Sequence, residues 1–443
     1  MSTVFGTDGV RGSVGDGPMT VEFAVRLASA AGRALIPPGG SVVVGKDPRI
    51  SGYMFESALE AGFVAAGANV KLLQVMPTPG IAYLTRVMGA DLGVVISASH
   101  NSFHDNGIKF FDRDGSKLSD GQQELVEKYL NDPPITRSSV SLGRAERRYD
   151  AVDRYSTFCK QSIPESVDFS GLRIVVDGAN GATYKIGPRV FADLGADVIS
   201  IGCSPNGKNI NDGCGSTCPA LLQSTVTALG ADLGIAFDGD GDRLVMVDHE
   251  GALVDGDQLV YLIAMSRLAE GSLKGPVVGT VMSNLGLEKA IRQHGIEFHR
   301  VGVGDRHVLA ALKEHGGIIG GETSGHVICL DKTTTGDGII SALQALAAVQ
   351  QAGKPLADLT QNMQRYPQKL VNVRVSKRVD VDGHPAIEAA VRDAEKTLGE
   401  NGRVVLRASG TEPVIRVMVE ARDAAMVDAL TAQLADVVAT EAT

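Results

Sequence analysis

The sequence predicts an α/β protein with several domains in series, and three observations support this fold class. The chain has 443 residues, roughly three times the length of an average domain. Short runs rich in Val and Ile alternate with longer stretches of helical spacing, which is the pattern of parallel α/β units. Near the C-terminus the pattern changes to alternating strands that flank helices, which indicates an α+β domain.

Groups of short apolar runs are expected to form the strands of three related α/β domains. These runs are 41–45, 70–75 and 92–96, then 172–177, 198–202 and 234–237, and finally 277–281, 298–301 and 318–320. Between the first two runs, 53–66 has apolar residues at helical spacing. In the last domain we expect strands at 370–375, 403–406 and 415–420, with helices at 386–398 and 424–440. Turn-rich segments then divide the chain into domains at 1–150, 151–250, 251–365 and 366–443.

The charge balance argues against a nucleic-acid partner. The formal net charge is −10 and the isoelectric point is near 5.4, so the chain lacks the basic surface that binds a phosphate backbone. A phosphate would have to be held by local Arg and Lys side chains. The N-terminus lacks the pattern of a signal peptide, no apolar stretch approaches a membrane span, and no membrane partner is expected. The five cysteines complete no zinc set and are expected to be free thiols in a reducing cytoplasm.

An acidic motif directly after the run 233–237 predicts a metal site. It reads Asp-Gly-Asp-Gly-Asp-Arg, with Asp238, Asp240 and Asp242 at alternate positions. Carboxylates at this spacing in an extended loop point the same way, and the glycines let the backbone curl around one centre. Three carboxylate oxygens suit a hard cation such as Mg²⁺, whereas without a cation three charges so close would repel one another. The alternative is a solvated acidic turn.

A serine-rich turn after the run 92–96 is a candidate nucleophile site. Ser97–Asn101 reads Ser-Ala-Ser-His-Asn, and Asp105–Phe111 follows it and contains Lys109. A serine just past a buried strand lies where α/β proteins bind ligands, and a neighbouring His or Lys could move a proton during attack. By itself such a turn is more often a helix cap, so this motif gains weight only together with the others.

Three further motifs offer groups that bind phosphate or sugar. Arg407–Pro413 reads Arg-Ala-Ser-Gly-Thr-Glu-Pro and would cradle a phosphate with its guanidinium, hydroxyls and backbone N–H groups. Gly320–His326 has alternating Glu, Ser and His that could bond sugar hydroxyls, with a simple glycine hairpin as the alternative. Phe5–Gly12 places Arg11 on a glycine-rich loop.

One pattern competes with these motifs. Gly202–Lys208 fits the G-x-x-x-x-G-K spacing of a P-loop, and 233–238 could serve as the strand that carries its second acidic group. The next residue is Asn209, so the Ser or Thr that binds Mg²⁺ in a P-loop is missing, and no helix opening follows. The P-loop interpretation is therefore rejected.

Taken together, the motifs resemble those of the α-D-phosphohexomutase superfamily. The resemblance covers essentially the whole chain, with the motifs in the family order and in all four domains. It implies a four-domain architecture around a central cleft, with three related mixed α/β domains and a C-terminal α+β domain. Phe5–Gly12, Thr333–Gly338 and Pro367–Val373 look most like the members that act on glucosamine phosphates, and phosphoglucomutase/phosphomannomutase is the alternative. One departure is Ser102, where the family often has Pro.

The resemblance implies a role for each motif residue. Ser99 would be the phosphorylated serine, and an oxygen of its phosphate would bind Mg²⁺ together with Asp238, Asp240 and Asp242. Arg11, His100 and Lys109 match positions around the phosphoserine, and Arg243 follows the metal loop as it does in the family. Glu322 and Ser324 match the sugar-binding loop, with His326 beside them as a proton-transfer group, and Arg407, Ser409, Gly410 and Thr411 match the loop that grips the non-reacting phosphate.

The implied reaction is an isomerisation through a sugar 1,6-bisphosphate. The phosphorylated Ser99 would give its phosphoryl group to a hexose monophosphate. The resulting bisphosphate would reverse its orientation in the cleft and return its other phosphate to Ser99. Lys109 is the first candidate for the general base, which requires a lowered pKa, and His326 is the alternative. The product would feed UDP-N-acetylglucosamine and cell-wall synthesis in a bacterial cytoplasm. Because dimers occur in the family, a homodimer is a further expectation.

Two other classes of function stay open. A metal-dependent phosphatase also uses a serine and Asp ligands, but a second metal site is hard to find in the sequence. A non-catalytic sugar-phosphate sensor would share the fold, and the intact Ser99, Lys109 and three aspartates argue against it. No side chain can be assigned from chemistry alone to a 2-amino group, so the choice of sugar follows from the resemblance.

Overall fold

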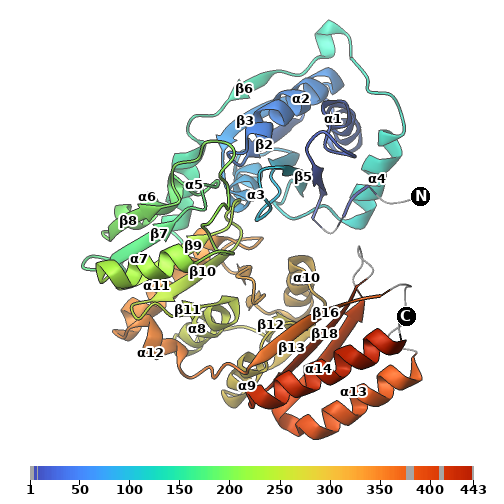
Figure 1. Ribbon diagram of the computed structural model, residues 1–443. Helices are drawn as coiled ribbons and strands as arrows, with labels where there is room; N and C mark the ends of the chain where they lie inside the picture. Colours follow the sequence, from blue (N-terminus) through green and yellow to red (C-terminus); the bar gives the residue numbers. More distant parts are fainter. Residues whose placement is uncertain (1–3, 7, 376–383, 409–413, 442–443) are drawn as a thin grey trace. The chain divides into compact units, whose positions relative to one another are not determined.

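The structure is a computed structural model that describes residues 4–6, 8–375, 384–408 and 414–441. The chain forms two compact units, and Figure 1 labels most of their helices and strands. Unit 1 is Met1–Thr280 with Val301–Gln361, and unit 2 is Val281–Arg300 with Asn362–Thr443. In the described part of the chain, none of the helices is both long and apolar enough to cross a membrane.

The first sheet of unit 1 has the strand order β1-β5-β4-β2-β3-β6. Its strands are β1 (Val10–Ser13), β2 (Ser41–Lys46), β3 (Asn69–Val75), β4 (Leu92–Ile96), β5 (Asp105–Asp112) and β6 (Ala145–Arg147). β2 is parallel to β3 and β4, whereas β5 is antiparallel to β4 and β1. Helices α1 (Val21–Leu35) and α2 (Ile50–Ala66) pack together, α4 (Asp120–Leu130) packs on α1, and α3 (Thr78–Val87) packs on β2 and β4 (Figure 1).

Local sequence explains where two of these helices begin and end. Ser119 and Gln122 form a capping box at the start of α4, in which each side chain accepts from the other residue's backbone N–H. Helix α2 stops at Gly67, whose φ of 93° lies in the left-handed region that suits glycine. The central strands β2 and β4 of this sheet are aliphatic and buried: every residue of β2 after Ser41 is buried, and residues 42–44 are all valine.

The second sheet of unit 1 has the order β11-β10-β9-β7-β8. Its strands are β7 (Arg173–Asp177), β8 (Asp197–Ile201), β9 (Leu233–Phe237), β10 (Leu244–Asp248) and β11 (Leu253–Val254), with helices α5 (Ala151–Lys160), α6 (Ile186–Asp193) and α7 (Ala220–Leu229). β7 is parallel to β8 and β9, and β10 is antiparallel to β9. The whole of β9 is buried, and the acidic motif forms its connection to β10.

The third part of unit 1 carries three strands and four helices. Strand β12 (Val277–Thr280) is parallel to β14 (Ile319–Gly321), which is antiparallel to β15 (Val327–Cys329). The helices are α8 (Gly256–Ala269), α10 (Asp305–His315), α11 (Gly338–Ala352) and α12 (Leu356–Thr360). β13 (Phe298–Val301) lies at the junction of the two units in the sequence.

Unit 2 is an antiparallel sheet covered by helices. β18 (Val414–Ala421) pairs with β16 (Gln368–Arg374) on one side and β17 (Gly402–Ala408) on the other. Helices α13 (Pro385–Leu398) and α14 (Ala424–Glu441) pack together along this sheet (Figure 1), and α9 (Leu285–Gln293) belongs to the same unit. The core between sheet and helices contains Ile387, Val417, Val419 and Leu434.

The predicted α/β fold class is confirmed, with sheets in three successive segments and an α+β region at the end. The sheets of the first two α/β segments are mixed, because β5 and β10 are antiparallel to their neighbours. Their connections, 97–104 and 238–243, are shorter than the dozen or so residues that a parallel crossover needs. The segment 105–111, which reads as a polar motif, is therefore a strand. The four domain boundaries stay a prediction.

Candidate active site

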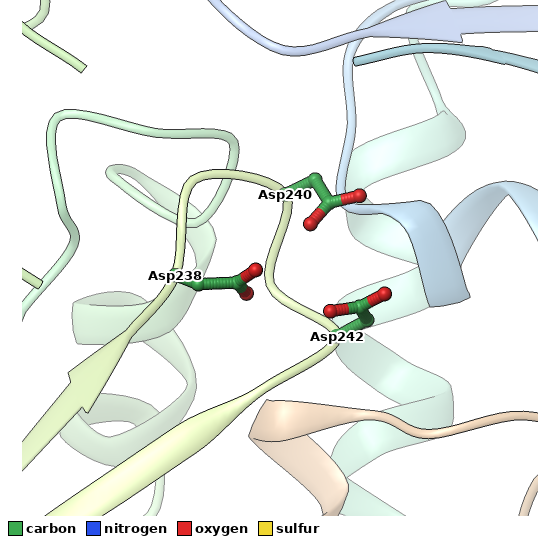
Figure 2. Close-up of side chains that lie close together, drawn as sticks. All are labelled: Asp238, Asp240 and Asp242. Carbon is green, nitrogen blue, oxygen red and sulfur yellow. The ribbon is translucent and has the colours of Figure 1, made fainter. Parts of the chain in front are cut away.

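The three aspartates of the acidic motif lie in the tight loop between β9 and β10. Their exposed fractions are 0% for Asp238, 1% for Asp240 and 5% for Asp242. One carboxylate oxygen from each lies within 4.8 Å of the others, and Figure 2 shows the three side chains gathered on the same loop. The structure thus brings together the residues that were predicted to hold a metal ion.

Two glycines allow this loop to form. Gly241 has a φ of 75°, and a β-carbon there would lie 2.5 Å from the side chain of Thr183. A β-carbon on Gly239 would lie 2.5 Å from the carbonyl oxygen of Ser99, so only glycine lets the serine turn come this close. The alternation of Asp and Gly therefore serves both the curl of the loop and its contact with the serine.

The chemistry of the aspartates fits a hard divalent cation. Asp240 Oδ1 and Asp242 Oδ1 are buried and have no hydrogen-bond partner among the described residues. Burial and then the charges of Asp242 and Asp240 raise the pKa of Asp238 well above its usual value. Buried carboxylate oxygens that lack partners and repel one another are stabilised by a cation such as Mg²⁺, which prefers oxygen ligands.

Ser99 faces this acidic loop directly. Its hydroxyl donates a 2.6 Å hydrogen bond to Asp238 Oδ2, and its side chain is buried, with the residue 2% exposed. The residue has a φ of 53°, in the left-handed region that a serine seldom adopts. Such backbone strain is common where a side chain must be aimed at a reaction centre.

The other two serines of the turn do not face the carboxylates. Ser97 donates to Asp47 Oδ2 at 2.6 Å and accepts the backbone N–H of Ser99 at 2.9 Å, so it shapes the turn. Ser102 is exposed. Of the candidates in this turn, Ser99 is the one that the structure places against the acidic loop.

A neutral imidazole lies against the Ser99 hydroxyl, and Arg243 lies against that imidazole. His100 Nδ1 lies 3.3 Å from Ser99 Oγ and 3.3 Å from Arg243 Nη1. Because a guanidinium only donates, Nδ1 is the acceptor and the proton of the neutral ring is on Nε2. Burial, followed by Arg243 and Arg11, lowers the pKa of His100 to about 4, so the imidazole is uncharged near neutral pH.

Lys109 is held by carboxylates from two segments. Its Nζ lies 2.8 Å from Asp240 Oδ2, 2.8 Å from Asp8 Oδ2 and 3.9 Å from Asp242 Oδ2. Burial lowers the pKa of Lys109, but the three carboxylates outweigh it, and the pKa is raised above the usual value. The lowered pKa that a general base needs is therefore not reached with these side chains alone, since their negative charge favours the ammonium of Lys109.

A chain of alternating charges continues from Asp8. Lys117 Nζ lies 2.6 Å from Asp8 Oδ1 and 2.6 Å from Asp305 Oδ2. Asp305 Oδ2 lies 3.4 Å from His326 Nε2, and His326 Nδ1 lies 3.8 Å from Asp242 Oδ2. Burial lowers the pKa of His326, yet Asp305 and Asp242 together raise it. The imidazole thus lies next to the acidic loop, and Asp305 and Asp242 favour its protonated form.

Several of these residues were not identified from the sequence. Asp8 lies within the quoted motif Phe5–Gly12, but Lys117 and Asp305 belong to no motif. Thr78 was also missed, and its hydroxyl donates a 2.6 Å hydrogen bond to Asp240 Oδ2. Single Lys, Asp and Thr residues are usually solvated, so only their position in the fold marks them.

The loop predicted to bind sugar lies in unit 1 with the acidic loop. Glu322 is 9% exposed, and its Oε1 accepts the backbone N–H of Gly304 at 3.0 Å. Ser324 is exposed and His326 is buried. The loop therefore offers an exposed hydroxyl beside a carboxylate that the backbone holds in place.

The loop predicted to grip phosphate begins in unit 2. Arg407 is half-buried at the end of β17 and lies opposite Arg416 of β18. Burial and then the positive charge of Arg416 lower the pKa of Arg407. Ser409, Gly410 and Thr411 lie outside the described residues.

Comparison with known families covers nearly the whole chain. The models of the phosphoglucomutase/phosphomannomutase family match in order: alpha/beta/alpha domain I over residues 2–134, domain II over 153–251, domain III over 255–366 and the C-terminal domain over 370–437. A phosphoglucosamine mutase of Methylococcus capsulatus is 56% identical over 437 residues, which are 98% of this chain and 98% of that protein.

Solved structures show the same fold. A phosphoglucomutase/phosphomannomutase family protein from Burkholderia thailandensis superposes with a TM-score of 0.82 at 24% identity, covering 99% of this chain and 97% of that one. The N-acetylphosphoglucosamine mutase of Aspergillus fumigatus, solved with GlcNAc-6P and magnesium, gives a TM-score of 0.69 at 18% identity over 99% and 96% of the two chains. The chain belongs to the phosphoglucomutase/phosphomannomutase family and, within it, to the phosphoglucosamine mutases.

Proposed function

We propose that the protein interconverts glucosamine 6-phosphate and glucosamine 1-phosphate through a phosphorylated Ser99. The observation that carries this proposal is the Ser99 hydroxyl, which lies 2.6 Å from Asp238 at the edge of three buried carboxylates. A serine beside a site for a divalent cation is placed to exchange a phosphoryl group. The name of the Methylococcus capsulatus relative supports the choice of sugar.

The reaction consists of two phosphoryl transfers in opposite directions. In the first, the bond between phosphorus and Ser99 Oγ breaks, a bond to the free sugar hydroxyl forms, and the hydroxyl proton passes to a base. The sugar 1,6-bisphosphate then reverses its orientation in the site, so that its other phosphate faces Ser99. In the second, its other phosphoryl group returns to Ser99, and the oxygen left on the sugar takes up a proton. The number of phosphoryl groups on the enzyme is the same at the start and at the end.

Asp238, Asp240 and Asp242 would hold Mg²⁺, together with an oxygen of the Ser99 phosphate. When bound, the ion supplies positive charge that offsets the charge of the phosphoryl group in transit. Arg243 and Arg11 add positive charge near His100, and therefore near the same hydroxyl. Phosphoryl transfer depends mainly on such positioning and charge neutralisation.

Lys109 and His326 are the candidates for the group that moves the proton. When Asp240 and Asp8 pair with it, Lys109 is an ammonium. It can then donate a proton to the oxygen that remains on the sugar after the phosphoryl group has departed. A cation held by the aspartates would weaken this pairing and favour the neutral amine of Lys109, which could then accept a proton. His326 beside Asp242 and Asp305 is the alternative.

The remaining predicted residues would hold the substrate. Glu322 and Ser324 would bond the sugar hydroxyls, and Arg407, Ser409, Gly410 and Thr411 would grip the phosphate that is not reacting. Holding that phosphate lets the same site accept the sugar in either orientation. It also favours transfer between serine and sugar over transfer to water.

The test is to compare turnover of glucosamine 6-phosphate, glucose 6-phosphate and mannose 6-phosphate, with trace sugar bisphosphate and Mg²⁺ present. We expect the highest kcat/KM for glucosamine 6-phosphate. If it is the poorest of the three substrates, the choice of sugar is wrong, and a phosphoglucomutase/phosphomannomutase is favoured. Release of inorganic phosphate without isomerisation would instead indicate a phosphatase, and binding without turnover would indicate a sensor.

A further inference from the structure

Two side chains from different parts of unit 1 meet at the main chain of the serine turn, Ser97–Asn101. The carbonyl oxygen of Ser99 accepts hydrogen bonds from Arg49 Nη2 at 2.9 Å and from Asn211 Nδ2 at 3.0 Å. The carbonyl oxygen of Asn101 accepts from the same two side chains, at 2.9 Å and 3.1 Å. Arg49 precedes α2, and Asn211 lies between β8 and α7, so the turn is held jointly by the segments of the first and second sheets.

Arg49 is fully buried and uses its guanidinium completely. Besides the bonds to Ser99 and Asn101, Nε donates to Asp47 Oδ2 at 2.8 Å, and Nη1 donates to the carbonyl oxygens of Ser102 and Asp105. A guanidinium has five N–H donors in a fixed plane, and each of them has an acceptor here. A lysine has three donors on a single nitrogen and cannot reach the same acceptors.

Asn211 holds the turn from the other side. It has a φ of 57°, a left-handed conformation that asparagine tolerates better than most residues. A β-carbon on Gly239 of the acidic loop would lie 2.8 Å from Asn211 Nδ2 and 2.5 Å from the Ser99 carbonyl oxygen. The Ser99 carbonyl is therefore the point where the serine turn, the acidic loop and the Asn211 segment touch.

We propose that Arg49 and Asn211 are positioning residues that fix the direction of the Ser99 side chain during phosphoryl transfer. This inference rests on the function proposed above. Ser99 Oγ alternates between a hydroxyl and a phosphate ester, so its own contacts change in each half-reaction. Its carbonyl oxygen is chemically unchanged throughout and offers a constant anchor. The four bonds to the turn keep Ser99 in its strained φ of 53°, from which Oγ points at Asp238.

The first test replaces the amide of Asn211 without disturbing its backbone. In Asn211→Gly the left-handed φ is retained at no steric cost, and both bonds to the turn are lost. The matched control is Asn180→Gly, because Asn180 also has a left-handed φ, of 45°, and also makes two hydrogen bonds to the main chain, at Asn209 and Ser204. These bonds do not involve the serine turn.

We expect Asn211→Gly to lower kcat by about 10- to 30-fold, on the order of two lost hydrogen bonds. KM for the sugar phosphate should change by less than about two-fold, because Asn211 is not expected to touch the substrate. Rapid-quench measurement should show the same fall in the rate at which sugar bisphosphate phosphorylates Ser99. Asn180→Gly should show a similar loss of Tm and a kcat close to that of the wild type.

The second variant, Arg49→Lys, keeps the positive charge and loses the planar set of five N–H donors. Its kcat per folded molecule should fall further than that of Asn211→Gly, with KM again little changed. A kcat for Asn211→Gly within two-fold of that for Asn180→Gly would overturn the inference. A rise in the KM of Asn211→Gly by the same factor as the fall in its kcat would also overturn it. Wild-type protein that fails to isomerise any phosphosugar would overturn the proposed function itself, so the two failures are distinguishable.

Discussion

Ser99 Oγ and Asp238 Oδ2 lie 2.6 Å apart although 139 positions separate them in the chain. The contact joins the turn after β4 to the loop after β9, and it is buried. The serine can donate this hydrogen bond only while it is a free hydroxyl. A phosphate on the same oxygen would repel the carboxylate, and a cation shared by the two groups would remove that repulsion.

Replacing Ser99 by Ala should abolish turnover while the protein still folds. Loss of a nucleophile lowers kcat by at least about 10⁴-fold, whereas loss of one hydroxyl hydrogen bond costs only about 1 kcal/mol of stability. Isomerisation would be followed by NMR of the sugar phosphates and folding by circular dichroism. Ser102→Ala is the matched control, because that hydroxyl is exposed and its loss should leave kcat unchanged. Full turnover by Ser99→Ala would contradict a phosphoserine mechanism.

Chelation of divalent cations should abolish turnover, and Mg²⁺ should restore it. Mg²⁺ should also raise the Tm, since binding at 100 times its Kd stabilises a folded protein by about 2.7 kcal/mol. Asp238→Asn should be more stable than the wild type without Mg²⁺, because it removes a carboxyl whose ionisation is disfavoured by burial and by the charges of Asp242 and Asp240. The same variant should lose most of the Mg²⁺-dependent rise in Tm. A rise equal to that of the wild type would place the ion elsewhere.

Lys117→Met should destabilise unit 1 by roughly 3 kcal/mol, as expected when one partner of a largely buried ion pair is removed. The change leaves Asp8 and Asp305 without the ammonium that lies 2.6 Å from each of them. Urea unfolding would measure the loss. Lys313→Met, at an exposed position, should change stability by less than about 0.5 kcal/mol. Adding Asp8→Asn to Lys117→Met should recover part of the loss, and no recovery would argue against this pairing.

The stability of the protein should depend on pH through Asp337. Burial raises the pKa of this carboxyl to about 6 from a usual value of 3.8, so between these values the folded state binds more protons than the unfolded state. Its contribution to stability is therefore greatest below pH 4 and falls as the pH rises to about 6. Over about two pH units the fall is up to roughly 3 kcal/mol.

Asp337→Asn isolates this contribution from those of other carboxyls. Asn can still accept the backbone N–H of Ile340 and cap α11, but it does not ionise. The variant should gain stability relative to the wild type as the pH rises from 4 to 7, measured by urea unfolding at each pH. Tyr155→Phe removes the 2.8 Å hydrogen bond that favours the Asp337 carboxylate. In this variant the pH range over which stability falls should therefore extend to higher pH. Parallel curves for wild type and Asp337→Asn would show that the raised pKa is incorrect.

The clustering of the three aspartates could be predicted because their arrangement is local. Asp238, Asp240 and Asp242 share one short loop, and their spacing alone brings the carboxylates together. Arg49, Asn211 and Lys117 could not be predicted, because each gains its partners only when distant segments meet. Asn211 even follows the segment whose spacing suggested a P-loop, and nothing in that pattern points to the serine turn.

The sequence by itself determined the fold class, the positions of most strands and the acidic loop, since hydrophobic period and short spacings act within a few residues. The tertiary structure decided the directions of β5 and β10, and it decided that Ser99 and not Ser97 faces the carboxylates. It also decided that the pKa of Lys109 is raised, because Asp8 and Asp240 reach it from other parts of the chain. The chemical state of a buried group depends on such neighbours in space, which residue order does not reveal.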